Sequence, residues 1–163
     1  MPWKKQKIVE LTEAEWGYVA GIIDGEGCLG VYTRSRQMMG SRQITSSRSF
    51  RPRLSIGNTS FELLYWLQAC FGGYLRVVPS HNTTGHWKDY GILNLQNVQV
   101  IFEICRRTCP YLIVKRAQAE LVLRFPFDIK CNQYTKELTL LTEETKNFLY
   151  QETLRLNKRG RED

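Results

Sequence analysis

The sequence predicts a single α+β domain in which helices alternate with pairs of strands. The chain has 163 residues, a length typical of one domain, and 42% of them are hydrophobic, which is enough to form a core. The spacing of apolar residues changes twice from helical to alternating. This pattern indicates the order helix, strand, strand, helix, strand, strand, followed by further helices, without an internal repeat at a fixed period.

The first predicted helix begins after Thr12 and runs to about Asp24. Thr12 is a good N-cap, and Glu15 three residues later completes a capping box. Glycines recur every four residues on one face of this helix, at Gly17, Gly21 and Gly25. Each glycine inside a helix costs about 1 kcal/mol relative to alanine, a cost that is accepted where a second backbone must approach closely.

Two acids, Asp24 and Glu26, stand at the end of this helix. The C-terminal end of a helix carries the negative pole of its dipole and disfavours negative charge. The glycine face therefore requires a neighbour, and the acids require positive charge. A second copy of the helix and a metal cation would supply both.

The remaining elements follow from alternation, caps and glycine or proline breaks. Pro52 suggests that the second strand is an edge strand or begins near this residue. In the first strand Leu29 and Val31 share one face, and Cys28, Gly30 and Tyr32 share the other. The predicted strands are Cys28–Arg36, Phe50–Ile56, Tyr74–Val78 and Trp87–Leu95, and the later helices are Phe61–Phe71 capped by Ser60, Asn97–Arg107, Ile113–Phe125 and Thr142–Leu156.

The charge pattern favours a polyanionic partner. The net charge is +7, and the stretch between Gly27 and Phe61 contains six arginines and no acid. Arginine suits phosphates and guanine edges, whereas a solvated surface normally mixes the two signs. DNA is therefore favoured over a merely solvated basic face. An odd cysteine count without a CxxC pair indicates a reducing, intracellular compartment, and no apolar run is long enough to span a membrane.

The segment that ends the first helix reads Val19-Ala20-Gly21-Ile22-Ile23-Asp24-Gly25-Glu26-Gly27. It resembles the signature of the LAGLIDADG homing endonucleases, with Glu26 where that family often has aspartate. An ordinary buried helix ending in a glycine-rich turn is the alternative, but it leaves the two acids and the glycine spacing unexplained.

The resemblance implies an αββαββα core over about 12–126, whose four-stranded antiparallel sheet forms a DNA-binding saddle, and a C-terminal helical segment over about 127–157. All of it would form one domain, 1–163. The chain carries one signature, which implies a homodimer. By resemblance, the helix interface would contain Gly17, Ala20, Gly21 and Asp24.

The resemblance also implies site residues. Glu26 and the Gly25 carbonyl would bind Mg²⁺ or another divalent cation such as Mn²⁺. Lys115 would sit near the scissile phosphate, because Pro110 to Leu123 resembles the corresponding family helix. Asn58 would orient a catalytic water, or would serve as a turn or cap residue. Relatives of this type carry an arginine a turn after Asn58, and the sequence Phe61-Glu62-Leu63 has none there.

The function implied is a homing endonuclease that cuts a long pseudo-palindromic DNA site with divalent metal and promotes intron mobility. An RNA splicing maturase, or a DNA-binding protein that does not cleave, is the alternative on the same fold, so RNA is an open second partner. The compartment would be an organelle or a prokaryotic cytoplasm. The candidates for DNA contact are Tyr32, Arg34, Arg36, Arg51, Arg53, Arg76, His86 and Lys88.

Overall fold

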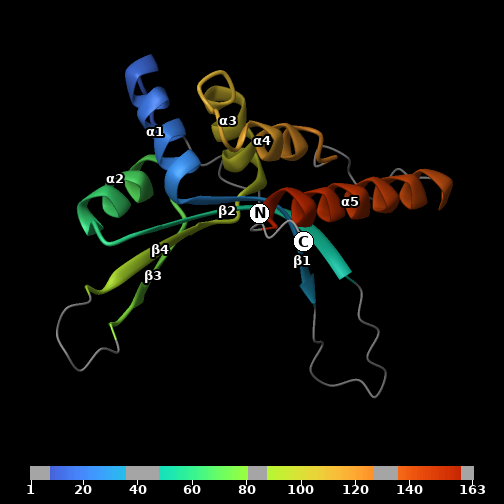
Figure 1. Cartoon of the computed structure of the whole chain (residues 1–163). Coiled ribbons are helices and arrows are strands. Elements are labelled where there is room, and N and C mark those ends of the chain that lie inside the picture. Colours follow the sequence, from blue (N-terminus) through green and yellow to red (C-terminus); the bar gives the residue numbers. More distant parts are fainter. Residues whose placement is uncertain (1–7, 36–47, 81–87, 127–135, 159–163) are drawn as a thin grey trace, which may run out of the picture.

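The computed structural model describes residues 8–35, 48–80, 88–126 and 136–158 (Figure 1). Helices and strand pairs alternate as the sequence predicts, and the α+β class is confirmed. None of the described helices is long and apolar enough to cross a membrane. The elements in chain order are α1 (Glu13–Glu26), β1 (Gly27–Ser35), β2 (Arg48–Asn58), α2 (Phe61–Phe71), β3 (Tyr74–Val78), β4 (Tyr90–Leu95), α3 (Val98–Thr108), α4 (Arg116–Leu123) and α5 (Lys136–Asn157).

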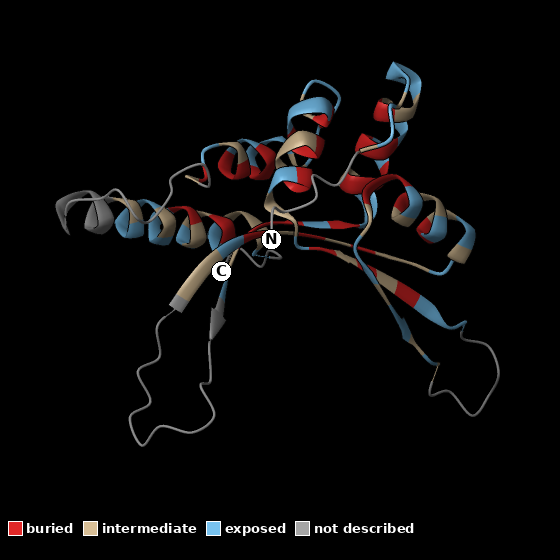
Figure 2. Ribbon diagram, turned by 180° about the vertical axis from the view of Figure 1, so that it is seen from behind, coloured by how far each residue is buried: buried red, intermediate tan, exposed pale blue. Residues whose placement is uncertain are grey.

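The four strands form one antiparallel sheet in the order β1-β2-β4-β3. Helices α1 to α4 lie on one side of this sheet, and the strands curve away from them, so that the opposite side is concave (Figure 1). Figure 2 shows that the buried residues of the helices gather on the surfaces that face the sheet and the neighbouring helices. The predicted four-stranded antiparallel saddle is therefore present.

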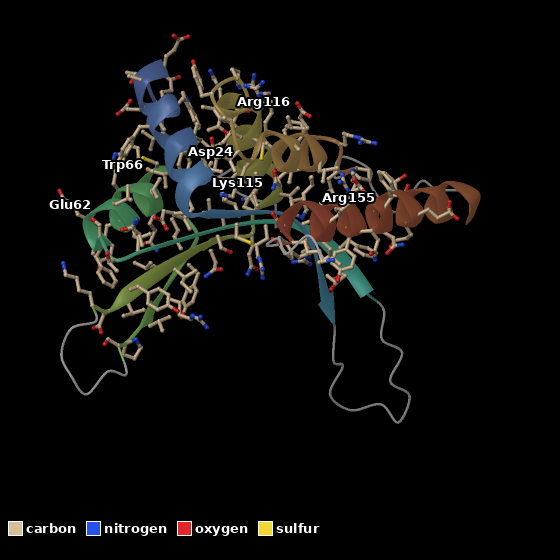
Figure 3. The ribbon with its side chains drawn as sticks, in the orientation of Figure 1. Asp24, Glu62, Trp66, Lys115, Arg116 and Arg155 are labelled. Carbon is tan, nitrogen blue, oxygen red and sulfur yellow. The ribbon has the colours of Figure 1, made fainter. Side chains whose placement is uncertain are left out.

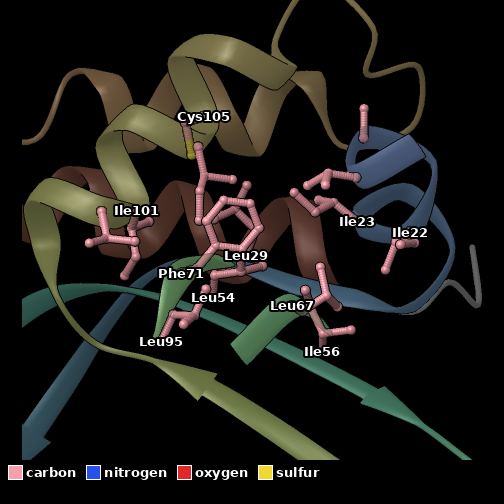
Figure 4. Packing of buried hydrophobic residues seen from close by; sticks show 14 of the residues in the cluster. Ile22, Ile23, Leu29, Leu54, Ile56, Leu67, Phe71, Leu95, Ile101 and Cys105 are labelled. Atoms are coloured by element: carbon pink, nitrogen blue, oxygen red, sulfur yellow. The ribbon is translucent and has the colours of Figure 1, made fainter. Parts of the chain in front are cut away.

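The core lies between the convex side of the sheet and the helices (Figure 4). Alternate strand residues such as Leu29, Leu54 and Leu93 point into it and are fully buried. Ile23 of α1 and Phe71 of α2 meet them from the helix side. Full burial of one such side chain stabilises the fold by about 1.5–3 kcal/mol, so this layer fixes both the sheet and the position of α1.

The intervening strand residues form the concave face. Strand register places Ser55 beside Asn94, and their side chains are joined by a hydrogen bond from Ser55 Oγ to Asn94 Oδ1 (3.1 Å). Arg76 pairs with Ile92, whose neighbours Gly91 and Leu93 are buried on the other face. The concave face is thus largely polar, as the alternation in the sequence predicts.

Several predicted element bounds hold and others shift. Both hydrogen bonds of the Thr12–Glu15 capping box are present, and α2 and β3 have the predicted bounds. β4 begins at Tyr90, later than predicted, and the side chain of Asp89 just before it accepts a hydrogen bond from the Ser80 N–H (2.8 Å). α5 begins at Lys136, six residues before the predicted cap at Thr142, which lies within the helix.

The expectation that Pro52 marks an edge strand or a strand start is wrong, because β2 is a central strand that begins at Arg48. Pro52 pairs with Val31, whose N–H points out of the sheet and donates to Thr153 Oγ1 (3.0 Å). In such a pair the two backbones point away from each other. The Pro52 nitrogen therefore faces the side of β2 on which β4 pairs only from Leu54 onward, and no ladder bond is lost.

Helix α5 runs beside β1, the edge strand, and takes up its outward-facing backbone groups. Thr153 accepts the Val31 N–H, and Asn157 Nδ2 donates to the Leu29 carbonyl (3.2 Å). A Cβ at Gly30 would collide with the Thr153 methyl group. The absence of a side chain at Gly30 is thus what allows α5 to approach the strand so closely.

Candidate active site and nucleic-acid interface

The turn between α1 and β1 presents the predicted metal ligands. Gly27 ends the helix in an extended conformation, and its N–H still donates to the Ile23 carbonyl. A Cβ at Gly27 would lie 2.6 Å from the Ile23 carbonyl oxygen, so a glycine is required there. The chain therefore leaves the helix at once, and Gly25 and Glu26 remain exposed at its end.

Asp24 holds the segment that precedes α4 (Figure 3). Its carboxylate accepts the backbone N–H groups of Ile113 (2.7 Å) and Lys115 (2.9 Å). Burial alone would raise the pKa of Asp24, but the N–H groups of Ile113, Lys115 and Val114, together with the Lys115 ammonium, lower it. Asp24 is thus a charged acceptor within its own chain.

Lys115 reaches the same helix end through its side chain. Its ammonium donates to the Asp24 carbonyl oxygen (2.6 Å), across 91 positions of sequence. The fold therefore places a cation at the negative pole of α1, one residue before Gly25. The predicted start of the last core helix at Ile113 is wrong, because the backbone of Lys115 is not helical and Lys115 is the N-cap of α4.

The glycine face of α1 is open. A Cβ added at Gly17, Gly21 or Gly25 would meet no atom within 4 Å. The prediction that Ala20 lies in the helix interface is wrong, because Ala20 is 1% exposed and packs in the core of its own chain. The helix turns 100° per residue, which carries Ala20 away from the glycine stripe.

Two apolar side chains that were missed in the sequence lie beside this face. Ile113 and Val114 are 86% and 68% exposed, and the hydrogen bonds to Asp24 hold the turn that carries them. In the sequence, Ile113 and Val114 are two β-branched residues directly before a helix, a pattern that also fits the start of the helix itself.

Asn58 ends β2 and uses its side chain locally. Its Oδ1 accepts the Ser60 N–H (2.8 Å), and Ser60 then caps α2. Asn58 thus has the turn or cap role that is one of its two predicted roles. Asn58 also lies two residues beyond Ile56, the strand partner of Gly27, so it stays in the same part of the sheet as Glu26.

The candidate DNA-contact residues fall into three groups. Arg51 and Arg76 are exposed on the concave face, and Arg53 is half-buried there against the Tyr32 ring. Lys88 is exposed but precedes β4 and lies outside the strand. Arg36 and His86 lie outside the described residues, as does the side chain of Arg34.

The residues present fit a shared metal site and do not form a complete one. Among the described residues, no group of three or more His, Cys, Asp or Glu side chains lies together. Mg²⁺ is commonly held by one or two carboxylates together with phosphate oxygens and waters. The exposed Glu26 carboxylate and Gly25 carbonyl suit that pattern, with further oxygen ligands coming from outside the protomer.

No protein-family model and no curated protein matches the sequence. Solved structures do match. The homing endonuclease I-CvuI, in complex with its target in the presence of calcium, is 21% identical, with a TM-score of 0.64 over 93% of this chain and 87% of its own. The archaeal intron-encoded homing endonuclease I-Vdi141I, complexed with DNA, is 18% identical, with a TM-score of 0.64 over 91% of this chain and 87% of its own.

A third structure, the LAGLIDADG homing endonuclease I-GzeII in complex with a DNA target, is 16% identical with a TM-score of 0.53. The match covers 93% of this chain but 45% of I-GzeII. The chain has the LAGLIDADG homing endonuclease fold. The segment of α1 that resembles the signature of this family lies where α1 passes into the sheet.

Proposed function

We propose that this protein is a site-specific DNA endonuclease that acts as a homodimer and depends on a divalent metal. One arrangement carries the proposal: Glu26 is exposed at the end of a helix with an open glycine face, and Lys115 is tethered to the same helix end through Asp24. A core helix has no need of an exposed glycine stripe, an exposed terminal acid and a lysine brought from 91 positions away.

The open face of α1 supports the homodimer. Two copies packed along Gly17 and Gly21 would bring their helix axes close together and would cover Ile113 and Val114. The match to I-GzeII supports the same arrangement, because this chain corresponds to about half of that protein. A two-fold dimer of this kind would place two Glu26 side chains at its centre, and their mutual repulsion favours a bound cation.

The chemistry proposed is hydrolysis of a phosphodiester bond. Glu26 and the Gly25 carbonyl would hold Mg²⁺ or Mn²⁺, which would offset the charge that develops on the scissile phosphate. Lys115, kept at the helix end by the Asp24 carbonyl, would add a second positive group beside that phosphate. The Asn58 amide nitrogen would remain available to orient water, since Asn58 Oδ1 is engaged by Ser60.

The concave sheet is the proposed DNA surface. Arg51, Arg53 and Arg76 lie on it, and phosphate contacts from such residues would make the affinity strongly dependent on salt. A symmetric dimer would favour a pseudo-palindromic target. Intron mobility is proposed as the consequence of cleavage, by analogy with I-Vdi141I, which is described as intron-encoded.

The test is cleavage of a randomised duplex library with Mg²⁺, followed by sequencing of the cut products. The wild type is compared with Glu26→Gln and with Glu13→Gln, which makes the same change at the exposed opposite end of α1. We expect cut sites with two-fold symmetry from the wild type and Glu13→Gln, and none from Glu26→Gln. If the wild type binds duplexes without cutting any, nuclease activity is rejected and RNA binding becomes the next assay.

A further inference from the structure

A cluster on the concave face joins the end of α5 to one of the arginines. The Arg53 guanidinium carbon lies 4.2 Å from the centre of the Tyr32 ring. The Tyr32 hydroxyl lies 2.9 Å from Cys28 Sγ and accepts a hydrogen bond from Asn157 Nδ2 (3.2 Å). Tyr32 is therefore held at both ends, by its ring and by its hydroxyl, and is part of a support beneath Arg53.

Strand register explains why Arg53 takes this position. Arg53 is paired directly with Gly30, and Tyr32 is the diagonal neighbour in β1. The space over Gly30 is occupied by the Thr153 side chain, and the Arg53 guanidinium lies over the ring of its diagonal neighbour Tyr32, a contact within reach of a long side chain. Among the described residues, Arg53 Nε is buried and has no hydrogen-bond partner, so the contact with Tyr32 is an important support for this guanidinium.

Asn157 uses both ends of its amide. Nδ2 donates to the Leu29 carbonyl and to the Tyr32 hydroxyl, at 3.2 Å each, while Oδ1 accepts from Gln118 Nε2 (3.3 Å). One side chain thus links α4, the edge of β1 and the support beneath Arg53. Burial, followed by the contact with Cys28, raises the pKa of Tyr32 to about 12, so its hydroxyl stays neutral near pH 7 while its oxygen accepts from Asn157 Nδ2.

We propose that Asn157 is a positioning residue for DNA recognition, which holds Tyr32 by its hydroxyl and thereby fixes the Arg53 guanidinium on the concave face. The inference rests on the proposed function, because it assigns DNA as the ligand of Arg53. It adds to that function that Asn157, the last residue of α5, sets the geometry of Arg53, an arginine that contacts DNA.

The experiment is a double-mutant cycle read as DNA affinity. The probe is a labelled duplex selected by the wild type from a randomised pool, with Ca²⁺ in place of Mg²⁺ and at one fixed salt concentration. Asn157→Ala is measured in the wild type, in Arg53→Met and in Arg76→Met. Arg76 is exposed on the same concave face and lies on β3, where it pairs with Ile92 and not with Tyr32, so it is the matched background.

We expect Asn157→Ala to weaken binding roughly two- to tenfold, the range that follows from one lost hydrogen bond. This loss should persist with Arg76→Met and disappear with Arg53→Met, because Asn157 then has no guanidinium to position. Equal losses in both backgrounds, or no loss in the wild type, would overturn the inference. Asn147→Ala, at an exposed position of α5, should leave the affinity unchanged.

A second variant protects the test against misfolding. Tyr32→Phe removes the hydroxyl but keeps the ring beneath Arg53 and leaves the bonds of Asn157 to Leu29 and Gln118 in place. It should show the same dependence on Arg53 as Asn157→Ala, and an additive effect would count against the inference. If the wild type selects no duplex at all, the proposed DNA function fails as well, whereas binding with additive losses rejects only the role of Asn157.

Discussion

Replacing Asp24 with asparagine tests whether its carboxylate holds the segment before α4. The carboxylate accepts two backbone N–H groups, at 2.7 Å and 2.9 Å. Asparagine keeps one acceptor oxygen, but its amide NH₂ group faces the other backbone N–H. One hydrogen bond is therefore lost, and two hydrogen-bond donors point at each other. A hydrogen bond to a charged group contributes about 1.5–3 kcal/mol. Because Asp24 is half-buried, we expect a loss of about 2 kcal/mol from the free energy of unfolding.

For a chain of this length, that loss corresponds to a fall in Tm of about 4–8 °C. The assay is thermal unfolding at one fixed protein concentration, since dimerisation would make Tm depend on concentration. The matched control is Asp89→Asn. Asp89 is exposed and accepts one N–H, from Ser80, so its loss should stay below about 1 kcal/mol. Equal Tm values for Asp24→Asn and the wild type would refute the reasoning.

The pH dependence of the same difference gives a further check. The pKa of Asp24 is lowered in the folded state, so its stabilising contribution is present above the ordinary value of about 3.9 and is lost as pH falls through the folded pKa. The gap in stability between the wild type and Asp24→Asn should therefore be constant from about pH 5 to 8. It should narrow only in stronger acid, and a gap that narrowed near neutrality would contradict the lowered pKa.

Two further predictions concern glycines. Gly21→Leu should leave each chain folded, because Gly21 is exposed and a Cβ there would meet no atom within 4 Å. It should block association, which analytical ultracentrifugation measures, and unchanged association would place the interface elsewhere. Gly30→Ala should destabilise the fold by about 1–3 kcal/mol through collision with the Thr153 methyl group. Adding Thr153→Ser to Gly30→Ala removes that methyl group and keeps the hydroxyl bonded to Val31, so the double variant should regain most of the lost free energy of unfolding, measured in urea. If it does not, the strain lies elsewhere.

Local signals in the sequence were sufficient where the structure is locally determined. The Thr12 capping box and the Ser60 cap place α1 and α2 correctly, because the caps act within one turn of their helices. Alternation assigns Arg51 and Arg53 to one face of β2, and Leu54 and Ile56 to the other. The specific signature in α1 led to the fold that the solved structures also indicate.

What the sequence could not provide depends on contacts over long separations. The segment before α4 is held by hydrogen bonds to Asp24, about 90 positions away. The tolerance of Pro52 in a central strand depends on where β4 begins to pair. The role of Asn157 was invisible because its partners are residues of β1 and α4 that no spacing rule connects with the end of α5.

The cover that α5 gives to β1 also has a consequence for biosynthesis. Val31 and Thr153 are 122 positions apart, and Leu29 and Asn157 are 128 apart. A ribosome therefore releases the first strand long before it makes the residues that occupy the outer edge of that strand. Until then, the growing chain presents unpaired backbone groups that another strand can bind. Contacts of such long range slow folding, so the yield of soluble protein in the cell should depend on chaperones that shield this strand until translation ends.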